Sequence, residues 1–161
     1  MPRSRRNLAS LLADLARDPR RPVFVRKTPY RTFRSTAGEI RSTALALAAR
    51  LDGAGVRPGD RVLLQGPDSP EWCAAFLGIV ARGAVAVPLD AGAPPEFSRK
   101  VAARVSARAA FLSAGAADAL REQVPFLAIL ENLSPPAGSA AASPEPYRAS
   151  PEESGKHQFG G

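Results

Sequence analysis

The chain has 161 residues and a formal charge of +7, with 45% hydrophobic and 23% charged residues. That length fits one ordinary domain with a real core and argues against two full catalytic domains. The single cysteine, Cys73, excludes an internal disulfide framework, and the single histidine, His157, leaves no Cys/His metal site.

The positive charge is concentrated near the amino terminus. Residues 1–34 hold ten Arg and Lys against two Asp, a net of +8, whereas the remaining 127 residues carry twelve basic and thirteen acidic groups. A nucleic-acid-binding domain normally spreads its basic side chains over a folded face, so we expect no nucleic-acid partner. We interpret residues 1–34 as a solvated basic arm, with contact to a membrane surface or an anionic partner as the alternative.

No targeting or membrane-spanning segment is expected. No apolar run approaches the roughly 20 residues that cross a bilayer. Asp14 and Asp18 interrupt the only leucine-rich stretch, which is not the pattern of a secretory signal. These observations predict a cytoplasmic protein.

The arm itself contains two expected elements. Four leucines recur at helical spacing, which predicts a short amphipathic helix: Leu8, Leu11, Leu12 and Leu15. This helix either packs on the domain or is a membrane-surface or transit-type segment. Residues 23–25 and 30–33 are β-prone runs around Thr28-Pro29 and predict a small hairpin.

The following hundred residues predict strands alternating with helices. Thr36 and Glu39 have the spacing of a capping box and begin a helix that Gly53 and Gly55 can end. Ser69, followed by a proline, begins a second helix that reaches Gly83. Further helices are expected from 94 to about 107 and near 116–123; strands are expected at 61–65, 84–87 (closed by Pro88), 109–112 and 126–130.

Apolar strands that alternate with helices of this length indicate a parallel sheet covered on both faces. Right-handed crossovers make an open, doubly wound α/β sheet the expected fold. We expect it to occupy residues 35–133. Residues 134–161 contain nineteen Pro, Gly, Ser or Ala among 28 positions, a composition typical of a flexible linker or tail.

Residues with catalytic chemistry are few. Ligands of open parallel sheets bind at the carboxyl ends of the strands, but the loop 66–69 has one glycine and a proline that lacks an N–H. Gly155-Lys156 lacks the rest of a Walker motif. Cys73 is interpreted as a small buried hydrophobe. Four acids near turns are interpreted as turn or helix-start residues rather than catalysts: Asp60, Asp68, Glu71 and Asp90. We therefore expect no catalytic and no metal-binding residue.

Four pieces in order resemble the N-terminal region of the adenylate-forming (AMP-binding) superfamily, of the acyl-CoA synthetase and fatty-acyl-AMP ligase type. Residues 32–40 are similar to its T-Y-x-E-L entry to the first long helix. Residues 51–62 resemble L-x-x-x-G-V-x-x-G-D-x-V, residues 67–72 resemble P-N-S-x-E-W, and residues 76–89 resemble F-x-A-x-x-x-A-G-A-x-x-V-P-L.

The resemblance implies the first N-terminal subdomain of an enzyme that makes an acyl-adenylate from a carboxylate and ATP, then transfers the acyl group to CoA or a carrier thiol. ATP, Mg and CoA are implied for the full-length family, but none for this chain alone. The family's phosphate loop, Tyr-Gly-x-Thr-Glu segment, ribose-binding Asp, Arg and lid lysine have no match here. Gly160 and Gly161 could stand where that loop begins.

Two functions follow from the resemblance. The first is an N-terminal portion of an acyl-activating ligase that is inactive alone and whose partner is the remainder of the ligase. The alternative is a standalone, non-catalytic interaction module that binds a full-length homologue, a carrier protein or a membrane surface through the basic arm. The sequence identifies neither the acyl substrate nor the acceptor.

Overall fold

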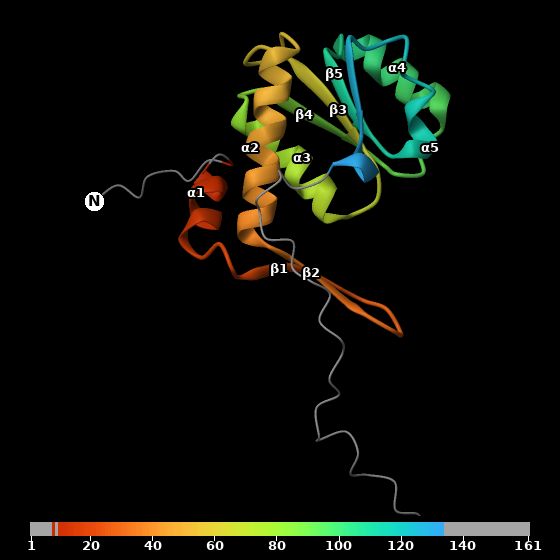
Figure 1. The fold of residues 1–161 in the computed structure, drawn as a ribbon. Helices are drawn as coiled ribbons and strands as arrows, with labels where there is room; N and C mark the ends of the chain where they lie inside the picture. The colour runs from red at the N-terminus through yellow and green to blue at the C-terminus, as the bar shows by residue number, and fades with distance from the viewer. Residues whose placement is uncertain (1–7, 9, 134–161) are drawn as a thin grey trace, which may run out of the picture.

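The computed structural model describes residue 8 and residues 10–133. Figure 1 shows an α/β body with a helix and a hairpin at one end. The helices are α1 (Ser10–Arg17), α2 (Ala37–Gly53), α3 (Pro70–Ala81), α4 (Pro95–Val105) and α5 (Ala114–Ala117), with a 3-10 turn, η1 (Leu130–Asn132). The strands are β1 (Pro22–Lys27), β2 (Thr32–Thr36), β3 (Arg61–Gln65), β4 (Val85–Leu89), β5 (Ala109–Leu112) and β6 (Phe126–Ile129).

The capping box predicted for the first long helix is confirmed in α2. The Thr36 side chain accepts a hydrogen bond from the Glu39 N–H at 3.3 Å, and the Glu39 carboxylate accepts one from the Thr36 N–H at 2.9 Å. Two of the helix's free donors are thereby satisfied. Ser69 caps α3 in the same way through the Trp72 N–H, with Pro70 at the first helical position. Both helices therefore begin where the sequence predicts.

The main sheet is parallel, with strand order β4-β3-β5-β6. Helices α2 and α3 lie on one face, and α4 and α5 on the other, as Figure 1 shows. Successive residues of β3 face opposite sides, so that Leu64 belongs to the α2–α3 core and Leu63 to the α4–α5 core. This is the predicted open, doubly wound α/β fold.

The two cores differ in composition. The core beneath α2 and α3 contains Phe111 and, at its margin, the stacked rings of Trp72 and Phe76, whose centroids are 5.7 Å apart. The core beneath α4 consists of aliphatic residues: Leu63, Ala102, Ala107, Ala110, Leu112, Leu120 and Val124. The buried members of this cluster on the α4 side therefore include no aromatic side chain.

Three local predictions differ from the structure. Pro88 lies inside β4 rather than closing it, because β4 is an edge strand of the described sheet and an edge tolerates a missing N–H. Gly55 (φ +77°) takes the left-handed conformation after α2, whereas Gly53 is still helical. Helix α5 ends at Ala117 instead of continuing to residue 123, and turns carry the chain onward to β6.

The amino-terminal helix packs on the body. Leu12 is buried in the α2–α3 core, and its carbonyl accepts a hydrogen bond from Arg41 Nε of α2 at 3.2 Å. Strands β1 and β2 pair in antiparallel register, as the β-prone runs predict. The expected boundary after residue 34 falls within β2. The expected linker, residues 134–161, lies outside the described residues.

Candidate functional site

The carboxyl ends of β3 and β5 form the topological switch point of the sheet. The chain leaves β3 toward α3 on one face and leaves β5 toward α5 on the other. Open α/β sheets bind their ligands in the crevice that such a divergence creates. The residues that follow these two strands are therefore the first candidates for a functional site.

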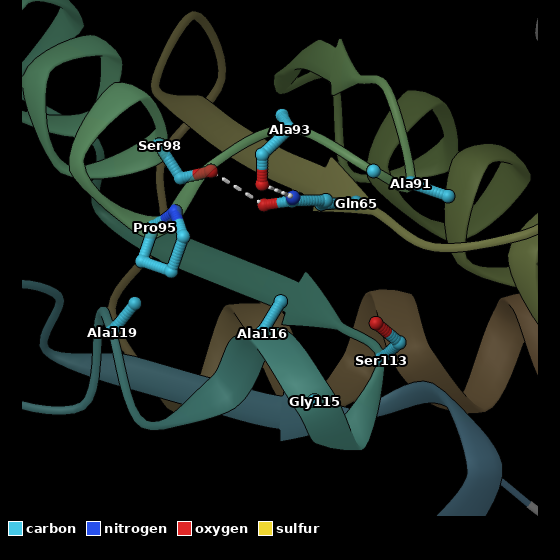
Figure 2. A pocket seen from close by; sticks show the side chains of 10 residues that line it. Gln65, Ala91, Ala93, Pro95, Ser98, Ser113, Gly115, Ala116 and Ala119 are labelled. Atoms are coloured by element: carbon cyan, nitrogen blue, oxygen red, sulfur yellow. Dashed lines mark hydrogen bonds between the residues drawn. The ribbon is translucent and has the colours of Figure 1, made fainter.

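A cavity of about 270 Å³ lies at this edge, on the α4–α5 side (Figure 2). It is lined by small residues with three polar side chains among them: Gln65, Ala91, Gly92, Ala93, Pro95, Ser98, Ser113, Gly115, Ala116 and Ala119. No titratable side chain lines the cavity. Its size falls just below the roughly 300–1,000 Å³ typical of small-molecule sites.

The cavity's two buried polar side chains satisfy each other. Gln65 ends β3 and is 1% exposed, as is Ser98 on α4. The Ser98 hydroxyl donates to Gln65 Oε1 at 2.7 Å, and Gln65 Nε2 donates to the Ala93 carbonyl at 3.2 Å (Figure 2). This pair fixes the loop after β4 against the end of β3. Its polar atoms are engaged within the protein and are not presented to a ligand.

The backbone donors beside the switch point are also engaged. The Ser113 N–H donates to the Gln65 carbonyl at 2.8 Å. The Ala114 N–H donates to the Glu131 carboxylate, whose two oxygens lie 3.0 and 3.2 Å away. Leu130 lies over Gly66, where an added Cβ would stand 2.5 Å from Leu130 Cδ1. The turn after β6 thus covers the crevice with an apolar side chain and a carboxylate.

None of the four acids considered from the sequence lines this cavity, although Asp90 bonds to the lining residue Gly92. The Asp60 carboxylate accepts from the Arg57 N–H at 2.8 Å, and the Asp90 carboxylate accepts from the Gly92 N–H at 2.7 Å, each within one turn. Glu71 stands in the first turn of α3. Gly155-Lys156 and the two terminal glycines, Gly160 and Gly161, lie outside the described residues.

Cys73 is half-buried on the first turn of α3. Burial, followed by the negative charge of Asp68, raises the pKa of the Cys73 thiol above its usual range. Both causes disfavour the thiolate, which is the reactive form. The surroundings of Cys73 therefore do not activate it as a nucleophile.

We expect Cys73 to react slowly with iodoacetamide near neutral pH, with a rate that still rises where an ordinary thiol has reached its plateau. Asp68→Asn should move the midpoint of this pH profile downward, because removal of a nearby negative charge lowers the energy of the thiolate. Asp90→Asn removes the same charge from another turn and should leave the profile unchanged. Equal shifts in both variants would contradict the assignment to Asp68.

The part of the chain that the structure describes contains neither a cluster of metal-ligating side chains nor a helix that could span a membrane. No group of three or more His, Cys, Asp or Glu side chains comes together among the described residues. None of their helices has the length and hydrophobicity to cross a bilayer. Fold and site together define the class: an open, doubly wound α/β unit whose carboxyl edge is built from small and internally paired residues.

Comparison with known proteins identifies the family. The model of the AMP-binding enzyme family matches residues 11–157. Over 72 residues, 45% of this chain, the sequence is 46% identical to pyochelin synthetase PchE of Pseudomonas aeruginosa. The chain therefore belongs to the AMP-binding enzyme family. It spans 5% of the length of that synthetase.

Two solved structures have the same fold. A Mycobacterium tuberculosis fatty acyl CoA synthetase superimposes with a TM-score of 0.66 at 26% identity, over 81% of this chain and 30% of that one. VinN superimposes with a TM-score of 0.64 at 32% identity, over 93% of this chain and 41% of its own. The chain corresponds to the N-terminal part of adenylate-forming ligases, as its four sequence motifs indicate.

Proposed function

We propose that this chain is the N-terminal part of an ATP-dependent acyl-activating ligase and has no activity alone. Such a ligase converts a carboxylate and ATP to an acyl-adenylate and pyrophosphate, then transfers the acyl group to CoA or a carrier thiol. The family match over residues 11–157, on a fold shared with a fatty acyl CoA synthetase, carries the proposal. A fatty or other hydrophobic acid is the substrate class that this relative favours.

The described residues do not fit ATP and Mg. A triphosphate needs cationic side chains or free backbone donors, whereas the cavity has no cation and the Ala114 N–H beside it is occupied by Glu131. The described residues likewise offer no carboxylate cluster for the metal. We therefore assign no catalytic step to them. ATP, Mg and CoA would be held by the remainder of the ligase, with Gly160-Gly161 proposed as the start of the phosphate loop.

The remaining parts of the proposal concern organisation and partners. Residues 1–34 would serve as a basic arm, residues 35–133 as the α/β subdomain and residues 134–161 as a linker toward the rest of the enzyme. The partner is the remainder of the ligase, in keeping with the small share of PchE and VinN that this chain spans. We propose a cytoplasmic location in which the arm can reach a membrane surface.

A chimera tests the proposal. VinN has been solved with L-aspartate, so its matched N-terminal portion can be replaced by residues 1–161 and L-aspartate binding measured by calorimetry. We expect the chimera to bind L-aspartate and to exchange pyrophosphate into ATP, while residues 1–161 alone do neither. VinN without its N-terminal portion is the matched control.

Two results would contradict the proposal. Carboxylate-dependent pyrophosphate exchange by residues 1–161 alone would show that the chain has catalytic groups of its own. A chimera that folds, as judged by circular dichroism, yet binds L-aspartate no better than the truncated VinN would show that this chain does not replace the N-terminal part of the fold.

A further inference from the structure

We draw no further inference here: the strongest candidate, the cavity of about 270 Å³ at the carboxyl ends of β3 and β5, belongs to the site already described, and its two buried polar side chains, Gln65 and Ser98, are hydrogen-bonded to each other.

Discussion

Replacing Phe111 by alanine is expected to lower the free energy of unfolding by about 3–5 kcal/mol. Phe111 is fully buried in β5, a central strand, and its ring contacts Phe126 edge-on at a centroid distance of 6.2 Å. The substitution leaves a cavity beneath α2 and α3, where surrounding strands and helices cannot close around it. Because small domains have only about 5–15 kcal/mol of stability, this change removes a large fraction of it.

The measurement is urea unfolding followed by far-ultraviolet circular dichroism, with the midpoint compared between variants. Phe97→Ala is the matched control, since Phe97 lies on α4 and is 50% exposed. It makes the same chemical change without a buried cavity and should alter stability by less than about 1 kcal/mol. Similar losses at the two positions would show that β5 does not occupy the centre of the sheet.

Gly78→Ala should destabilise the chain by about 1–3 kcal/mol, although alanine is the better helix former. An added Cβ at Gly78 would stand 2.8 Å from the Ala44 carbonyl oxygen and 3.0 Å from Leu47 Cβ. Neither neighbour is the end of a flexible side chain, so α2 and α3 must separate to accommodate a methyl group. The close approach of these two helices therefore depends on the absence of a side chain at this position.

Gly53→Ala provides the comparison within the same helix pair. Gly53 ends α2, and an added Cβ there meets no atom within 4 Å. This variant should be unchanged or more stable by up to about 1 kcal/mol, because alanine loses less chain entropy on folding. If Gly78→Ala is as well tolerated in the urea midpoint as Gly53→Ala, the helix–helix contact is looser than the structure shows.

Much of the fold could be predicted because its signals are local. Thr36 and Glu39 specify the start of α2 by contacting each other across one turn, and the apolar run 61–65 specifies β3. The position of Pro88 inside β4 could not be predicted from the local sequence, since a proline is tolerated within a strand only at the edge of a sheet. The neighbours of a strand are set by the whole sheet and not by the adjacent sequence.

The candidate site could be predicted only in its location. The alternation of strands and helices predicts that a site lies at the carboxyl ends of the strands. The hydrogen bond between Gln65 and Ser98 could not be predicted in the same way, because it joins residues 33 positions apart. One signal was available: Ser98 stands four residues before the buried Ala102 and so lies on the inward face of α4. Glu131 gave no such signal, because its bond to the Ala114 N–H depends on how the chain turns after β6.

The proline of β4 makes the two borders of the main sheet chemically unequal. Within the described residues, β4 and β6 each have one unpaired border. Pro88 deprives β4 of a backbone donor, which limits edge-to-edge association with another strand. Strand β6 has four non-proline residues and retains a complete row of donors and acceptors. A further strand added to this sheet would therefore find an unbroken row of backbone hydrogen-bonding groups along β6 and an interrupted row along β4.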